Sequence, residues 1–256
     1  MALLRCDFFA ETLGLSTSMT VVLPERAAGR IGMAGGSRDE VPVLYLLHGL
    51  SDDDTIWTRR TSIERYVAEL GIAVVMPQVH QSFYSDEVHG LPFWTFLTDE
   101  LPALVHRFFR LSDRREDTFV AGLSMGGYGA MKWALREPWR FAAAASLSGA
   151  LALRHPTDRA DPGFAALMGR VFGDEPTAAT PDDVLHLVDT SDPGELPALF
   201  VACGTEDFLY PANEEFVRRA ALAGVPLTID FGPGDHEWSY WDARIQDVLA
   251  WLPLRS

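Results

Sequence analysis

The strongest constraint on the fold is a regular alternation of apolar runs with helical patterns. Residues 41–47 are almost wholly apolar, without the every-second-residue polarity of a half-exposed strand, which is typical of a strand buried on both faces of a sheet. Further strand-like runs occur at 72–76, 118–121, 142–148, 198–203 and 227–231, and helical spacing occurs at 62–70, 98–109, 127–136, 212–223 and 240–252. This alternation predicts an α/β fold with a mostly parallel sheet flanked by helices.

Three segments depart from that rhythm. The opening runs 3–10 and 19–23 predict two antiparallel edge strands, and residues 25–40, rich in Gly, Ala and Arg, predict an exposed hairpin loop. The connection 154–196 is long and rich in proline. Because structureless loops of that length are uncommon and usually functional, we expect a small cap over a site. The whole chain, 1–256, then forms a single domain.

Charge and cysteine content restrict the setting in which the protein works. The formal net charge is −15, which disfavours binding to nucleic acid or to an anionic membrane surface. Cys6 and Cys203 each lie in an apolar run and predict buried thiols in a reducing compartment rather than a disulfide framework. Arg5, Asp7 and Glu11 interrupt the start of the chain, so we see no signal peptide and expect a cytoplasmic protein.

A candidate nucleophile lies in the stretch Gly122-Leu123-Ser124-Met125-Gly126. A Gly-x-Ser-x-Gly pattern is weak by itself, but here it stands between a predicted strand and a predicted helix. In the α/β-hydrolase fold this turn holds the serine in strained backbone geometry, and the two glycines let strand and helix pass closely. We therefore expect Ser124 to be the nucleophile of a serine hydrolase; the alternative is an ordinary glycine-rich turn with a capping serine.

A serine hydroxyl needs an adjacent base, and in this fold the acid and then the histidine follow the serine along the chain. His236 lies between the last strand and the last helix, where the base is expected, whereas His155 and His186 fall in the cap segment and are interpreted as solvated. The strand 198–203 leads into Glu206 and Asp207. We prefer Asp207 as the acid that orients the imidazole, with the exchanged roles left as the alternative.

Two backbone amides are expected to bind the oxyanion. One belongs to Met125, directly after the nucleophile, and the other to Leu50, in the loop after the first buried strand. Gly49 permits the turn of that loop. His48 is interpreted as a structural support of the loop rather than a catalytic group.

Other polar and aromatic residues receive weaker assignments. Trp57, Trp94 and Trp238 lie in or beside loops at the expected active-site edge and are candidates for a substrate pocket, although core packing is the default for aromatic side chains. The acidic run 52–54 lacks the spacing of a calcium loop and predicts a solvated helix start. We expect no metal and no cofactor.

Four ordered blocks resemble the tributyrin esterases of the esterase D group. They are Leu44-Tyr45-Leu46-Leu47-His48-Gly49-Leu50-Ser51, Ala121-Gly122-Leu123-Ser124-Met125-Gly126-Gly127-Tyr128-Gly129, Cys203-Gly204-Thr205-Glu206-Asp207-Phe208-Leu209-Tyr210 and His236-Glu237-Trp238-Ser239-Tyr240-Trp241. The resemblance implies a short-chain carboxylesterase with Ser124, Asp207 and His236 as its triad and a small acyl ester as its ligand. It leaves open a homo-oligomer.

Alternatives from the same superfamily and from outside it remain at this stage. Residues 81–86 and 95–102 are similar to mycolyltransferases, which implies acyl transfer to an alcohol, and S-formylglutathione hydrolases are a further branch of the group. The third alternative is a catalytically silent hydrolase fold that serves as a binding module. Such folds typically lack a triad member, and here all three candidates are present.

Overall fold

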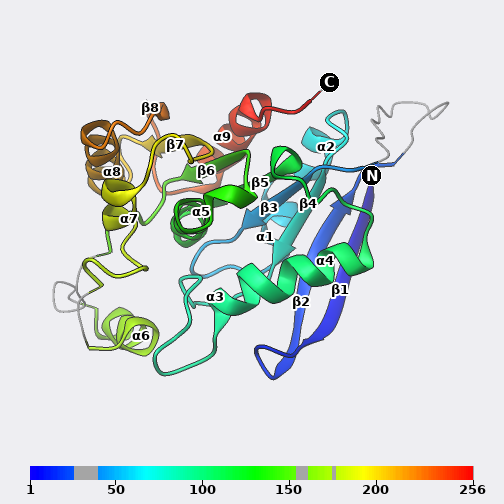
Figure 1. The fold of residues 1–256 in the computed structure, drawn as a ribbon, viewed down its shortest axis with the longest axis horizontal. Helices are drawn as coiled ribbons and strands as arrows, with labels where there is room; N and C mark the ends of the chain where they lie inside the picture. The colour runs from blue at the N-terminus through cyan, green and yellow to red at the C-terminus, as the bar shows by residue number, and fades with distance from the viewer. Residues whose placement is uncertain (26–39, 154–160, 175–176, 256) are drawn as a thin grey trace.

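A mixed β-sheet forms the centre of the computed structural model, which describes residues 1–25, 40–153, 161–174 and 177–255. Within these residues the sheet has eight strands in the order β1-β2-β4-β3-β5-β6-β7-β8 (Figure 1). Their bounds are β1 Ala2–Ala10, β2 Leu15–Leu23, β3 Val43–Leu47, β4 Ala73–Pro77, β5 Thr118–Leu123, β6 Ala143–Leu147, β7 Ala198–Gly204 and β8 Thr228–Gly232. The α/β-hydrolase fold predicted from the sequence is confirmed.

The strand register brings several chain segments to one edge of the sheet. The strands β4, β3, β5, β6, β7 and β8, which are neighbours in this order, are parallel to one another. β2 runs antiparallel to both of its neighbours, β1 and β4. Leu47, near the end of β3, pairs with Gly122 of β5, and Leu123 pairs with Leu147 of β6. Leu147 in turn pairs with Ala202 of β7. The loops that leave the carboxyl ends of these strands therefore meet at one edge.

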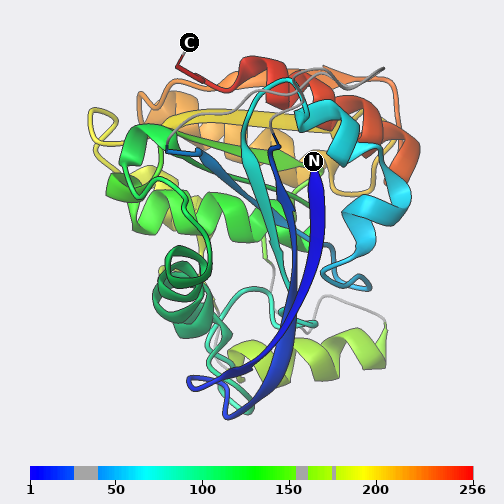
Figure 2. The ribbon, with the colours of Figure 1, turned by 90° about the vertical axis from the view of Figure 1, so that its right-hand side faces the viewer.

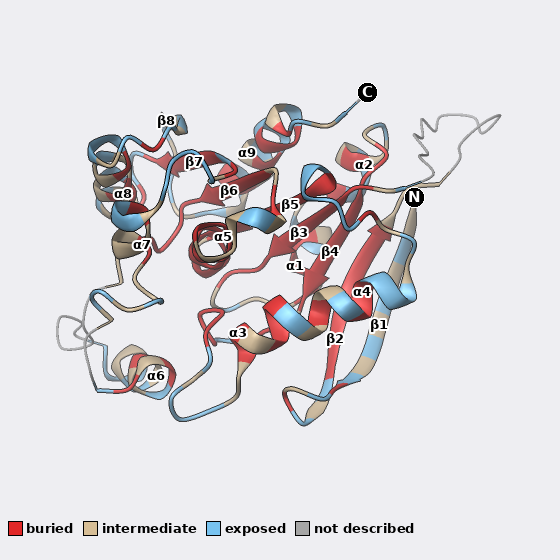
Figure 3. Ribbon diagram, in the orientation of Figure 1, coloured by how far each residue is buried: buried red, intermediate tan, exposed pale blue. Residues whose placement is uncertain are grey.

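Helices cover both faces of the sheet, and the strands from β2 to β7 are mostly buried, whereas the edge strands β1 and β8 are partly exposed (Figure 3). The core on one face includes side chains of α1 (Ile56–Arg60), α2 (Ile63–Val67) and α9 (Trp238–Trp251). The core on the other face includes side chains of the remaining α-helices and of the π-helix η1, with the bounds α3 Phe93–Thr95, η1 Phe96–Glu100, α4 Leu101–Phe108, α5 Met125–Arg136, α6 Pro162–Phe172, α7 Val184–Thr190 and α8 Tyr210–Leu222. Two short 3-10 helices, η2 Arg115–Asp117 and η3 Pro138–Arg140, complete the described elements.

Some predicted elements differ from the structure. The helix expected at 62–70 is the shorter α2. A separate helix, α1, precedes it and buries Ile56 and Trp57. The sequence did not predict α1, because its five residues are too few to show helical periodicity. The helix expected at 98–109 starts earlier, at Phe93, and includes the π-helical turn η1, whose spacing a search for 3.6-residue periods misses. The loop predicted at 25–40 lies almost wholly outside the described residues.

The two cysteines have different surroundings. Cys203 is buried in β7, as expected, but Cys6 is only half-buried, so the prediction of two buried thiols is wrong for Cys6. β1 is an edge strand whose side chains alternate between partly covered and exposed positions, so an apolar run there does not imply burial. Both thiols are free.

The connection predicted as a cap contains α6 and α7. α6 lies at the same end of the molecule as the turn between β1 and β2 (Figures 1 and 2). The segment before α7 is held to α5 by an ion pair between the fully buried Lys132 and the partly exposed Asp182, in which Lys132 Nζ lies 2.5 Å from Asp182 Oδ1. The same ammonium donates to Ser85 Oγ at 2.7 Å and to the carbonyl of Tyr84 at 2.9 Å. Burial lowers the pKa of Lys132 to about 8, against the opposing charge of Asp182.

Candidate active site

Ser124 occupies a sharp turn between β5 and α5. Its φ of 53° and ψ of −117° are unfavourable for a residue with a side chain, so the surrounding structure must enforce them. A Cβ on Gly122 would collide with the backbone of Gly126, and a Cβ on Gly126 would lie 2.7 Å from the carbonyl oxygen of His48. Only glycine at both positions permits this close passage of strand, helix and neighbouring loop.

The side chains of Ser124, His236 and Asp207 form one hydrogen-bonded path. His236 Nε2 lies 3.1 Å from Ser124 Oγ, and His236 Nδ1 lies 2.9 Å from Asp207 Oδ2. With Asp207 ionised, Nδ1 carries the proton and donates it to the carboxylate, which leaves Nε2 free to accept from the serine hydroxyl. The side chain of Asp207 is fully buried and that of His236 is 18% exposed.

Several donors stabilise the ionised form of Asp207. Burial opposes ionisation, but hydrogen bonds from His236, from the Leu209 amide and from Ser148 outweigh it, so the pKa of Asp207 lies below its ordinary value. The Leu209 N–H donates to Oδ1 at 2.8 Å. A carboxylate that stays charged can stabilise an imidazolium beside it.

Ser148 was not identified from the sequence. It follows β6 with a φ of 48°, is fully buried, and its amide donates to the carbonyl of Ala202 at 2.7 Å. Its hydroxyl accepts a hydrogen bond from Trp241 Nε1 at 3.2 Å and donates to Asp207. The ring of Trp241 also meets the ring of His236 edge-on, with centroids 4.8 Å apart. Ser148 therefore supports Asp207, and Trp241 packs on His236.

Glu206 anchors the loop that carries the histidine. Its Oε2 accepts from the Gly234 amide at 2.6 Å, while its own amide donates to the Gly234 carbonyl at 3.0 Å. These bonds hold the loop after β7 against the loop after β8, and they lower the pKa of Glu206. The carboxylate of the exposed Glu206 bonds Gly234 and Thr205, whereas the imidazole bonds Asp207, which favours Asp207 over Glu206 as the partner of the histidine.

The two predicted oxyanion donors belong to segments that abut each other. A Cβ on Gly49 would lie 2.7 Å from Leu123 Cδ1. Since Leu123 directly precedes Ser124, the loop with Leu50 packs closely against the turn that holds the nucleophile. Within the described part of the chain, neither the Leu50 amide nor the Met125 amide donates a hydrogen bond, so both are available to a ligand. Asp52 fixes the loop, because its Oδ2 accepts from the Gly49 amide at 3.2 Å.

The acidic run 52–54 is not the solvated helix start that the sequence predicts. Asp54 is 3% exposed, and its carboxylate accepts from Ser18 Oγ at 3.0 Å and from Thr20 Oγ1 at 2.8 Å. Asp52 is half-buried, and burial raises its pKa. This acidic run ties the loop that contains Leu50 to β2.

His48 is a buried, neutral support of the same loop. Its Nδ1 lies 2.8 Å from the Gly49 carbonyl and its Nε2 accepts from the Val79 amide at 3.2 Å. This pattern requires the proton on Nδ1, and burial lowers the pKa of His48 to about 4. The histidine connects the loop after β3 with the loop after β4.

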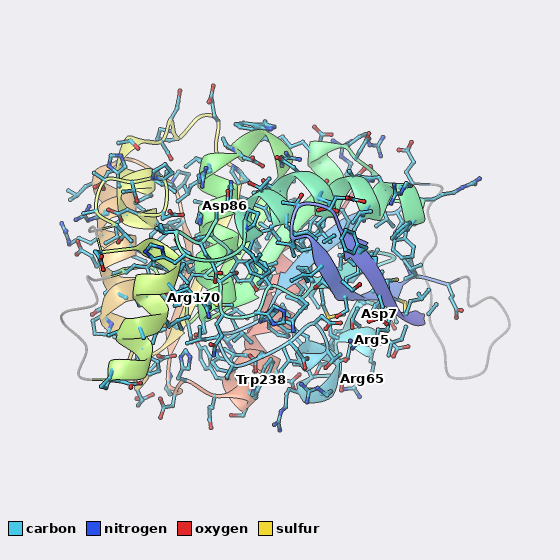
Figure 4. The ribbon with its side chains drawn as sticks, turned by 90° about the horizontal axis from the view of Figure 1, so that it is seen from below. Arg5, Asp7, Arg65, Asp86, Arg170 and Trp238 are labelled. Atoms are coloured by element: carbon cyan, nitrogen blue, oxygen red, sulfur yellow. The ribbon has the colours of Figure 1, made fainter. Side chains whose placement is uncertain are left out.

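Two of the three tryptophans expected in the pocket are core residues. Trp57 is 1% exposed and donates from Nε1 to the Leu47 carbonyl at 3.1 Å. Trp94 is 7% exposed and lies beneath the charges of Lys132 and Arg136. Neither indole offers a surface to a substrate, so these two predictions fail on burial. Trp238, labelled in Figure 4, is only half-buried. Its ring packs on Trp241, which in turn meets the ring of His236.

A cleft of about 520 Å³ adjoins the predicted oxyanion loop. Its lining consists of Leu15, Leu50, Ser51, Asp52, His80, Gln81, Glu87, Leu91, Phe93 and Arg170. Arg170 reaches it from α6 and pairs with Glu87 at 3.1 Å (Figure 4). The lining mixes apolar side chains with groups of both charges. Sequence reasoning missed it because its residues come from four separate segments of the chain.

Phe208 is a second residue that the sequence did not single out. It is 69% exposed, and its ring centroid lies 4.6 Å from that of His236. An exposed aromatic ring at this position forms part of the rim of the site.

Metal-ligand clusters and membrane-spanning helices are both absent from the described residues. No group of three or more His, Cys, Asp or Glu side chains among them is arranged to hold a metal ion. None of the helices in these residues combines the length and apolarity needed to cross a membrane.

Comparison with known proteins identifies the family. Residues 11–252 match the family model described as "Putative esterase". The chain belongs to that family. An acetyl esterase from Caldicellulosiruptor saccharolyticus is 28% identical to this esterase in an alignment of 262 positions that covers 98% of each chain.

Two solved structures from Staphylococcus aureus are similar to the esterase over nearly its whole length. The fluorophosphonate-binding serine hydrolase F is 34% identical, with a TM-score of 0.89 and coverage of 100% of this chain and 99% of that chain. The S-formylglutathione hydrolase FrmB is also 34% identical, with a TM-score of 0.82 and 98% coverage of both chains. The esterase is therefore a carboxylic ester hydrolase of the serine type, and its resemblance to the esterase D group is confirmed.

Proposed function

We propose that the esterase hydrolyses short-chain acyl esters through an acyl-enzyme on Ser124, with His236 as the base and Asp207 as the acid. The observation that carries this proposal is the continuous hydrogen-bonded path from Ser124 Oγ through the imidazole to Asp207, at 3.1 and 2.9 Å. Nucleophile, base and orienting acid in contact are the arrangement that acyl transfer to a serine requires.

The proposed reaction has two halves. As the Ser124 hydroxyl attacks the ester carbonyl, His236 Nε2 takes its proton, and Asp207 stabilises the imidazolium that results. His236 then gives this proton to the departing alcohol, which leaves the acyl group on Ser124. In the second half His236 deprotonates a water molecule that attacks the acyl carbonyl; the acyl–Oγ bond then breaks, His236 returns the proton to Ser124 Oγ, and the carboxylic acid leaves.

The amides of Leu50 and Met125 are the proposed donors to the tetrahedral oxyanion. Their lack of partners in the described residues supports this role, because an oxyanion donor should have no competing acceptor. Met125 also begins α5, so the positive end of the helix dipole reinforces its amide.

We assign the cleft beside Leu50 to the substrate, and the segment 154–196 to a cap over it. Arg170 of α6 lines this cleft, which supports the assignment of the cap. Phe208 and Trp238 are proposed contacts on the side of His236, since the exposed ring of Phe208 lies against its ring and the half-buried Trp238 packs on Trp241, which also meets it.

Hydrolysis rates on p-nitrophenyl esters from acetate to decanoate test the proposed substrate class. We expect kcat/KM to be highest at about two to four acyl carbons and to fall for longer chains, because each methylene that a short pocket excludes loses about 1 kcal/mol of binding. An optimum at long chains would contradict a short-chain esterase.

Transfer and thioester activities are separable outcomes. The similarity to an S-formylglutathione hydrolase is a reason to include a thioester of glutathione in the same series. Product analysis with a competing alcohol acceptor distinguishes an acyltransferase from a hydrolase. Failure of a fluorophosphonate probe to label Ser124 would instead support the silent binding module.

A further inference from the structure

The outer edge of β1 is long and unpaired. The strand spans nine residues and stands last in the strand order, so within the described residues only β2 pairs with it. In Figure 2, which looks onto this side of the molecule, β1 lies at the front. Apart from the bonds to β2, no backbone group of residues 2–9 bonds to another described residue. A free row of N–H and C=O groups about 30 Å long can pair with a further strand.

The exposed side chains of β1 combine apolar ends with a charged middle. Leu3 and Phe9 are 54% and 53% exposed. Between them, the side chains of Arg5 and Asp7, labelled in Figure 4, are 54% and 70% exposed. The strand contains no proline, and its two charges have opposite signs. The features that usually protect an edge strand against pairing, proline and charges of one sign, are therefore missing.

A second copy of β1 fits this pattern when the two strands run antiparallel about Cys6. Residues equally far from the centre of such a two-fold pair face each other. Leu3 then faces Phe9 of the second copy, and Arg5 faces Asp7 of the second copy. Cys6 is the middle residue of β1, so this register also pairs the whole strand. Apolar side chains meet apolar ones, and each charge meets its opposite, both of which favour cross-strand pairing.

Other registers of the same pair are less favourable. The centre must lie on a residue, because the outward N–H and C=O groups belong to alternate residues in both copies. Moving it by one residue from Cys6 places Arg5 opposite Arg5 or Asp7 opposite Asp7, and like charges directly opposite each other disfavour pairing. The edge at the far end of the sheet has the same defect. β8 is five residues long, and pairing about its middle residue places Asp230 opposite its own copy.

We propose that two copies of the esterase dimerise through β1, in antiparallel register about Cys6, so that their sheets join into one. The net charge of −15 opposes self-association. Salt at about 150 mM screens charges that lie more than about 8 Å apart, whereas the facing Arg5 and Asp7 side chains are in contact. The dimer does not depend on the proposed reaction, because Ser124 follows β5, three strands away from β1 in the sheet.

The mass of the full chain in solution tests the dimer. Light scattering during gel filtration at about 150 mM salt and about 0.1 mM protein should give twice the chain mass of 28.3 kDa. Asp7→Arg places an arginine opposite Arg5 at two symmetric points, and it should weaken dimerisation at least about tenfold. Glu195→Arg, at an exposed residue before β7, changes the net charge equally and should leave dimerisation unchanged.

Exchanging the two charges is the decisive variant. Arg5→Asp combined with Asp7→Arg restores opposite charges across the pair, so its dimerisation constant should return to within about threefold of the parent value. Arg5 also lies 3.8 Å from Asp54, and the melting temperature of the double variant therefore checks that it is folded. A folded double variant that dimerises no better than Asp7→Arg would overturn the proposed register.

Oxidative cross-linking tests the register without any charge change. The two Cys6 residues face each other, with Cα atoms about 5 Å apart, which a disulfide can span. Diamide, which oxidises two thiols to one disulfide and is itself reduced to a hydrazine, should give a covalent dimer that Cys6→Ser abolishes. Leu3→Cys in the Cys6→Ser background is the matched control, because the two copies of residue 3 lie about 20 Å apart.

Three results would overturn the dimer through β1. One is a monomer at about 0.1 mM, and another is a dimer that Asp7→Arg does not weaken. The third is cross-linking through Leu3→Cys as fast as through Cys6. None of these measurements uses catalysis, so their outcome is independent of whether Ser124 is the nucleophile.

Discussion

At the scale of single residues, Ser148 shows how the site depends on groups that never meet the substrate. Its hydroxyl lies between Trp241 and Asp207, and its backbone is held at a φ of 48°. A residue with a side chain rarely adopts such a backbone angle, so the surrounding structure must enforce it where Ser148 supports the carboxylate. We interpret Ser148 as a positioning residue that acts through Asp207.

Replacing Ser148 by alanine tests this interpretation. We expect kcat to fall about tenfold with little change in KM, since the loss of one hydrogen bond to a charged group weakens the support of Asp207 in the transition state. Threonine, which keeps the hydroxyl, should restore part of the rate. Ser146→Ala, two residues earlier in β6, is the matched control, because the buried Ser146 hydroxyl has no partner among the described residues. An equal loss of kcat in Ser148→Ala and Ser146→Ala would show that Ser148 contributes to packing and not to the positioning of Asp207.

Lys132 makes a second prediction at this scale. It is the only lysine in the sequence, so protein labelled with ¹³C-lysine gives one side-chain signal. We expect the Cε shift to titrate near pH 8, because burial disfavours the charged amine.

The same titration changes stability in a defined direction. The folded pKa of Lys132, about 8, lies below its unfolded value, so the unfolded chain binds more protons between the two. The contribution of Lys132 to the free energy of unfolding should therefore rise as the pH increases above about 8. Relative to Lys132→Met, wild-type protein should gain stability between about pH 7 and 9.5. A difference that shrinks over this window would contradict the lowered pKa.

The residues of the predicted triad could be named from the sequence because chain order in the fold assigns the roles of serine, acid and histidine. Ser148 could not, since its role depends on a strained backbone angle and on β6 lying next to β7. Trp57 and Trp94 were misassigned for a related reason. An aromatic residue beside a loop has the same local pattern whether it faces the core or the solvent.

At the scale of elements, the turn between β5 and α5 depends on the absence of side chains. We expect Gly126→Ala to lower the free energy of unfolding by at least about 3 kcal/mol, because its Cβ would collide with the backbone of Leu47 and His48. Gly169→Ala is the matched control. Gly169 lies in α6, where an added Cβ would have nothing within 4 Å, so this change should stabilise by up to about 1 kcal/mol. Chemical denaturation measures both values, and similar small effects would show that the turn tolerates a side chain.

The inner parallel strands were predictable because burial on both faces gives a mostly apolar run, whereas the edge strand β8, which is partly exposed, was recognisable by its place in the alternation of strands and helices. α1 and η1 were not, since the first is too short for periodicity and the second has a different period. The cleft beside Leu50 was equally hidden from the sequence. Its walls come from the loops after β3 and β4, from β2 and from α6, and only the fold brings these segments together.

At the scale of the whole molecule, the net charge of −15 acts on charged substrates. An overall negative field slows the approach of anions and speeds that of cations, and salt screens both effects. Between about 10 and 200 mM salt we expect kcat/KM to fall several-fold for acetylcholine and to rise for acetylsalicylate. Phenyl acetate, which is neutral, is the control and should change little. A rise for acetylcholine with added salt would contradict a field set by the net charge.

The central claim is that Ser124 forms the acyl-enzyme, and kcat of purified, folded Ser124→Ala on p-nitrophenyl acetate tests it most directly. If chemistry limits the wild-type rate, we expect kcat to fall about 10⁶-fold, because the remaining groups have no nucleophile to activate. Hydrolysis by the variant at close to the wild-type rate would contradict the claim.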